Sequence, residues 1–64
     1  MDQNLITVRV QLHPDQAWAL AQLVKRIGFS DCRALAQNDE QAYHMVYAAE
    51  RLRRALAAAG IAPR

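Results

Sequence analysis

The sequence predicts a small α+β domain that is mostly helical, with one N-terminal β-strand followed by two or three α-helices. Apolar and polar residues alternate over residues 5–12, whereas apolar residues recur at helical spacing over most of the remaining chain. A chain of 64 residues also leaves room for a single domain only, residues 1–64. The expected order is therefore β-α-α-α, with a short second helix.

The predicted strand covers residues 5–12, Leu-Ile-Thr-Val-Arg-Val-Gln-Leu. The alternation places four aliphatic side chains on the inner face, at Ile6, Val8, Val10 and Leu12. Thr7, Arg9 and Gln11 then lie on the outer face. A lone strand leaves its backbone N–H and C=O groups unpaired. We therefore expect this strand to pair with the same strand of a second chain in a homodimer.

Helices are predicted over residues 14–27, 31–37 and 39–59. Pro14 suits the first position of the first helix, and Gly28 suits a left-handed residue at its end. Ser30 is expected to cap the second helix and Asn38 the third. Because no Gly or Pro interrupts the second and third helices, a single kinked helix is the alternative to two separate ones.

Composition argues against several classes of function. His13 and His44 fall in different predicted elements, and neither has ligand spacing with a cysteine or carboxylate, so we expect no catalytic residue and no metal. Cys32 is the one cysteine, which rules out an internal disulfide and a cysteine-based zinc site. No apolar run approaches the ~20 residues of a membrane span. We expect a cytoplasmic protein without cofactor, membrane or small-molecule substrate.

Arginines and aromatic residues supply the binding candidates. The net charge of +2, carried mainly by arginines, is compatible with phosphates or an acidic protein as partner. One flank of the third helix gathers such residues at helical spacing, namely Tyr43, Tyr47, Arg51 and Arg54. Trp18 falls on the polar side of the first helix, where either a later helix covers it or it anchors a partner.

Residues 5–37 resemble the ribbon-helix-helix DNA-binding family, through the alternating residues 6–12, Pro14-Asp15 and Gly28-Phe29-Ser30 before another helix. The resemblance implies that strands from two chains form a ribbon in the major groove of double-stranded DNA. It further implies base contacts by the outer residues Thr7, Arg9 and Gln11, and a phosphate clamp at Ser30 and Asp31. Arginine can bond guanine, glutamine can bond adenine, and helix N-termini bind phosphate. The first hypothesis is a dimeric DNA-binding transcriptional regulator.

The whole chain also resembles a group of short bacterial proteins found on phages and plasmids. The similar segments are Gly28-Phe29-Ser30, Arg33-Ala34, Glu40-Gln41-Ala42-Tyr43, Met45 and residues 57–64. This resemblance implies no established activity, but it implies a setting on mobile elements, which encode small inhibitors of host defence systems. The second hypothesis is a protein-binding inhibitor or adaptor of the anti-defence or anti-CRISPR type. Its partner would be a host or defence-system protein, bound through Trp18 and the Tyr43, Tyr47, Arg51 and Arg54 flank.

Overall fold

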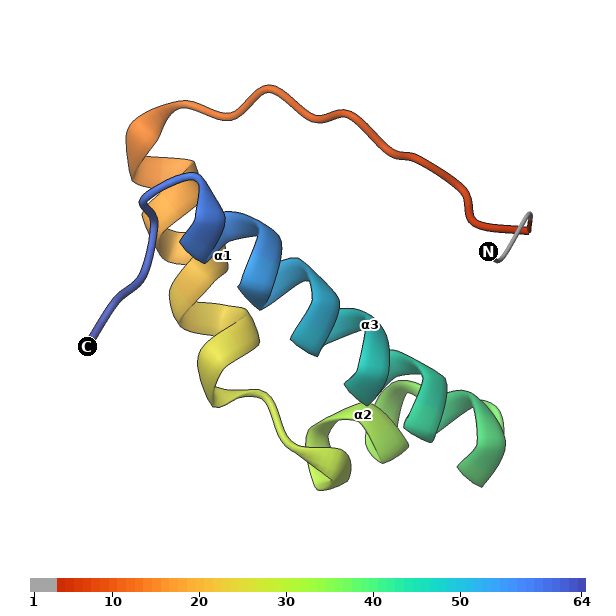
Figure 1. The fold of residues 1–64 in the computed structure, drawn as a ribbon. Helices are drawn as coiled ribbons and strands as arrows, with labels where there is room; N and C mark the ends of the chain where they lie inside the picture. The colour runs from red at the N-terminus through yellow and green to blue at the C-terminus, as the bar shows by residue number, and fades with distance from the viewer. Residues whose placement is uncertain (1–3) are drawn as a thin grey trace.

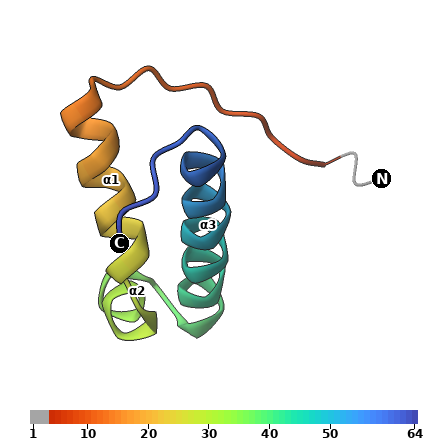
Figure 2. The same cartoon turned by 60° about the vertical axis from the view of Figure 1, so that its left-hand side comes forward.

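The computed structural model describes residues 4–64, so residues 1–3 of the predicted domain lie outside the described part. The described chain forms three helices, α1 (Pro14–Arg26), α2 (Phe29–Leu35) and α3 (Asp39–Ala58). Helices α1 and α3 run side by side in opposite directions, and α2 lies at one end of the pair (Figure 1, Figure 2). Helix α3 contacts both α1 and α2, so it is the element on which the other two pack.

The predicted N-terminal strand is wrong. Residues 4–64 contain no β-strand, so the described chain is α-helical, not α+β, and the β-α-α-α order with a strand pair fails with it. Residues 5–12 instead run as an extended arm that leaves the first turn of α1 and diverges from that helix (Figure 1). A strand requires a backbone partner, and no backbone hydrogen bond within residues 4–64 joins this arm to another segment. We call residues 5–12 the N-terminal arm.

The turn between α1 and α2 also differs from the prediction. Helix α1 ends at Arg26, and Ile27 turns the backbone to an extended conformation with ψ 132°. Gly28 has φ −119°, so it is not the left-handed residue that the sequence predicted. It is instead the N-cap of α2, and its N–H donates to Oδ2 of Asp31 at 2.9 Å. Ser30 therefore lies inside the first turn of α2 and does not cap it.

Residues 31–59 form parts of two helices and not one kinked helix. The backbone is extended at Ala36 (ψ 155°) and at Asn38 (φ −159°), which separates α2 from α3. Oδ1 of Asn38 accepts the N–H of Gln41 at 2.8 Å and so caps α3. Across the break, Nε of Arg33 donates to Oδ1 of Asp39 at 2.6 Å. The helix cap and the ion pair together fix the residue at which α3 begins.

The buried core is small. Its hydrophobic members in the described chain are Ala21, Val24, Cys32 and Ala42. Short side chains let helices approach closely, but they bury little apolar area. The inner face predicted for residues 5–12 is not buried, since Ile6 is 87% exposed, Val8 75% and Val10 67%. The Cα radius of gyration is 12.8 Å, against about 10.7 Å for a compact chain of this length.

The cap of α3 gives a first prediction. We expect Asn38→Ala to lower the free energy of unfolding by about 1 kcal/mol, because the N–H of Gln41 loses its acceptor. Asn38→Asp retains an acceptor at the same position and should stay close to wild type. Urea denaturation followed by circular dichroism measures both variants. Equal stability of Asn38→Ala and wild type would show that this cap does not stabilise the break between α2 and α3.

Candidate functional site

All four aromatic side chains of this protein are exposed. Trp18 is 45% exposed, Phe29 39%, Tyr43 51% and Tyr47 62%. Large aromatic side chains usually dominate a protein core because each buries a large apolar area. Here the core consists of smaller residues, and the aromatic area faces outward. Exposed Trp and Tyr are the residue types that binding hot spots favour.

Three of these aromatic residues gather where α2 packs on α3. The ring of Phe29, at the start of α2, lies with its centroid 4.8 Å from that of Tyr43, at a tilt of 37°. Tyr47 follows Tyr43 by about one turn of α3, and Arg51 follows by another. From Tyr43 to Arg51 the row is about 12 Å long, at the rise of an α-helix. We call Phe29, Tyr43, Tyr47 and Arg51 the aromatic ridge.

Phe29 was not among the residues that the sequence singled out. It lies between the helices predicted over residues 14–27 and 31–37, so the sequence predicts no partner for its side chain. Its contact with Tyr43 depends on how α2 packs on α3, which no local spacing reveals. The one feature of the sequence that could have indicated Phe29 as a binding residue is its position as an aromatic residue just before a predicted helix.

The arginines near the ridge differ in whether they form ion pairs. Nε of Arg53 donates to Oε2 of Glu50 at 2.9 Å, and Nε of Arg54 donates to Oε1 of Glu50 at 3.3 Å. The hydrogen bond from Arg53 is the main cause that lowers the pKa of Glu50 to about 2, and it raises the pKa of Arg53. No hydrogen bond or ion pair of Arg51 is present within residues 4–64. Arg51 therefore supplies the available positive charge of the ridge.

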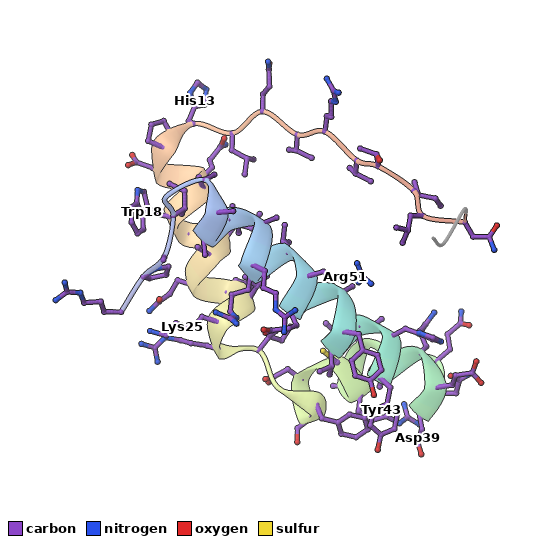
Figure 3. All side chains as sticks on the ribbon, in the orientation of Figure 1. His13, Trp18, Lys25, Asp39, Tyr43 and Arg51 are labelled. Atoms are coloured by element: carbon purple, nitrogen blue, oxygen red, sulfur yellow. The ribbon has the colours of Figure 1, made fainter. Side chains whose placement is uncertain are left out.

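Trp18 does not belong to the same surface as the tyrosines. It lies in the N-terminal half of α1, whereas Tyr43 lies at the opposite end of the molecule (Figure 3). No later helix covers Trp18 fully, since 45% of it is exposed. The sequence hypothesis treated Trp18 and the Tyr43 flank together, and the structure separates them into two surfaces.

The DNA-binding candidates are also divided between two places. Thr7, Arg9 and Gln11 are exposed on the N-terminal arm, and Ser30 is exposed on α2. The arm begins at one end of α1 and α2 lies at the other end (Figure 2), so one chain does not bring the two groups together. At the N-terminus of α2 the carboxylate of Asp31 accepts the Gly28 N–H. A carboxylate in that place repels a phosphate, which argues against the phosphate clamp.

Other chemistry finds little support in residues 4–64. No group of three or more His, Cys, Asp or Glu side chains there could hold a metal ion. Cys32 is a buried free thiol. Nε2 of His44 lies 3.8 Å from Oε1 of Glu40 on the exposed side of α3. None of the helices in the described part has the length and apolar character that crossing a membrane requires.

The described surface also carries apolar grooves, of which two are wide. One, of about 490 Å³, lies between α1 and α2 and includes Leu23 and Leu35, which are 57% and 75% exposed. The other, of about 420 Å³, lies under the N-terminal arm. These two leucines are exposed because they border the open space between α1 and α2.

The Glu50 cluster gives a second prediction. In a carbon-detected NMR titration the carboxyl of Glu50 should titrate at about 2, and Arg53→Ala should raise that pKa toward 4.5. Because the folded-state pKa lies below the unfolded one, the stabilisation is present at neutral pH and is lost as the pH falls from about 4.5 to about 2. Arg51→Ala, on the same helix, should leave the Glu50 titration unchanged. A midpoint near 4.5 in wild type would contradict the pairing.

Comparison with known proteins gives a family but no activity. No curated protein and no solved structure matches the chain. One family, described as a family of unknown function (DUF7706), has a model that matches residues 1–64. The match spans the full chain, so this protein belongs to the DUF7706 family.

Proposed function

We propose that this protein is a non-enzymatic binding module that acts as an inhibitor or adaptor by docking a partner protein on the aromatic ridge. The observation that carries this proposal is the exposure of Phe29, Tyr43 and Tyr47 side by side, with Arg51 at the end of the row. When a partner protein covers an exposed aromatic cluster, the removal of apolar area from water lowers the free energy of the complex.

The scaffold of the ridge favours tight docking. Tyr43, Tyr47 and Arg51 all stand on α3, which packs against both other helices. Phe29 and Tyr43 restrict each other through their ring contact. Side chains held in this way lose less conformational entropy on binding than side chains on a loose loop. The ridge is therefore suited to a preformed pocket on another protein.

The charges define the chemistry of the partner. Arg51 makes no ion pair within residues 4–64, and Arg54 is 76% exposed in its side chain although it contacts Glu50. A matching surface has an apolar pocket for the tyrosines, with a carboxylate at the edge that faces Arg51. A host or defence-system protein in the cytoplasm is the partner that this proposal names, in keeping with Cys32 as a free thiol.

Tyr47 is the most exposed of the three ridge aromatics and gives the third prediction. We expect Tyr47→Ala to weaken binding of a partner protein at least tenfold, since truncation of a hot-spot tyrosine costs about 2 kcal/mol or more. His44→Ala is the matched control, because His44 is an exposed ring on the same helix outside the ridge. Quantitative affinity purification from host lysate identifies partners, and calorimetry with the purified candidate measures the affinities.

The comparison of the two variants decides the outcome. A partner that binds Tyr47→Ala and wild type equally does not use the ridge, and the proposal fails for that partner. Equal losses for Tyr47→Ala and His44→Ala would mean that α3, and not the ridge, was disturbed. Circular dichroism of each variant separates a loss of binding from a loss of folding.

A second candidate function, regulation of transcription by binding double-stranded DNA, rests on the arm. Thr7, Arg9 and Gln11 are exposed there, and Arg9 makes no ion pair within residues 4–64. These three residues alternate with the aliphatic ones, so in an extended segment they share the side opposite to the groove. A cation on such a face can contact a phosphate or a guanine.

The DNA candidate gives the fourth prediction. Retention of the wild-type protein on duplex DNA should fall steeply between low and moderate salt, because phosphate contacts release counterions. Arg9→Ala should weaken that retention, and Arg64→Ala, which removes an exposed arginine at the other terminus, should change it less. Wild-type protein that passes duplex DNA at low salt without retention would eliminate this candidate.

A further inference from the structure

An open apolar groove lies between the N-terminal arm and the helices, and the described chain does not fill it. Its lining within the described part of the chain is aliphatic throughout, from Val8, Val10, Leu12, Leu20, Leu52 and Leu56. Its volume is about 420 Å³, which is enough for several side chains. Val8 and Val10 remain 75% and 67% exposed although they face this space. Ile6, further along the arm, is 87% exposed.

The exposed area of the chain is too large for a self-sufficient monomer. A folded protein of 7.2 kDa exposes about 4,100 Å² by the usual scaling of surface with mass. This chain exposes 5685 Å². The excess of about 1,600 Å² is twice the ~800 Å² that each partner buries in a standard interface, and it falls in the range of obligate homodimers.

We propose that the groove is the interface of a homodimer, in which a second copy of this chain lays its N-terminal arm into the groove. Each copy then contributes the aliphatic side of its arm and receives that of the other. Ile6 and Val8 of one chain come to lie against the lining leucines of its partner copy. The arm of each chain thus fills the groove of the other chain, which that chain's own helices leave open.

A second copy fits this groove better than a different protein does. No charged residue of the described chain lines the groove, and residues 6, 8, 10 and 12 of the arm are all aliphatic, so the two surfaces match in chemistry. In a two-fold symmetric dimer each arm lies in the groove of the other chain, so one type of contact buries both arms and both grooves. The buried core of Ala21, Val24, Cys32 and Ala42 is small, so a permanent partner is needed, and a second copy is always present where the protein is made.

The fifth prediction tests the interface by mass. Light scattering at micromolar concentrations should give wild-type protein a mass of about twice 7.2 kDa. Val8→Asp places a carboxylate on the groove side of the arm, and we expect it to shift the protein to monomer, because the charge cannot be buried unpaired. Thr7→Asp is the matched control, since the same charge one residue away lies on the other side of the arm and should leave the dimer intact.

Three results of this experiment would overturn the proposal. Wild-type protein of monomer mass would mean that the arm serves another protein or closes on its own helices. A dimeric Val8→Asp would place the interface elsewhere. Equal loss of the dimer in Val8→Asp and Thr7→Asp would show that the sidedness of the arm does not matter. Tyr47→Ala, the ridge variant, should remain dimeric, so this test is independent of the ridge.

A wild-type measurement covers the case in which Val8→Asp fails to fold. A sample mixed from isotope-labelled and unlabelled chains reports contacts between chains only. Isotope-filtered NMR spectra should contain cross-peaks from methyl groups of Ile6 and Val8 in one chain to Leu52 and Leu56 in the other. A dimer whose spectra lack these cross-peaks uses a different surface, and that result overturns the assignment of the groove.

Discussion

The shortage of buried apolar area is the constraint on which the rest of this structure depends. A chain of 64 residues buries only about 60% of its unfolded surface. Within residues 4–64 the buried hydrophobic residues are few and short, with Cys32 the largest side chain that is fully buried. The helices pack closely through Ala21 and Ala42, but such contacts contribute little hydrophobic free energy. The aromatic rings and the arm are therefore exposed. Both proposed interfaces consist of this exposed apolar area.

Helix α3 connects this constraint to the proposed functions. Among the helices of the described chain it alone contacts both others. It contributes to the ridge through Tyr43 and Tyr47 and to the groove through Leu52 and Leu56. Its start is fixed by the Asn38 cap and by the Arg33–Asp39 ion pair. The ridge lies toward the start of α3 and the groove toward its C-terminal end, so the two proposed interfaces use different residues of one helix.

The sequence predicted the helices better than the arm, for a physical reason. Pro14 and Asn38 mark helix starts through local geometry and capping, so residues near them suffice to place the helices. Alternation over residues 5–12 specifies an extended backbone, but a strand also requires a partner, and no local pattern supplies one. Likewise the spacing of Tyr43, Tyr47 and Arg51 predicted the flank, whereas the contact of Phe29 with Tyr43 depends on tertiary packing.

The proposed homodimer, in which a second copy covers the arm and groove of each chain, makes folding depend on association. The most direct test is the thermal unfolding midpoint of wild-type protein, measured over a roughly hundredfold range of protein concentration. Association that is coupled to folding makes the midpoint rise with total protein concentration. We expect that rise here, with a single cooperative transition at every concentration. A midpoint that stays constant over the whole range would show that the monomer is self-sufficient and would contradict the claim.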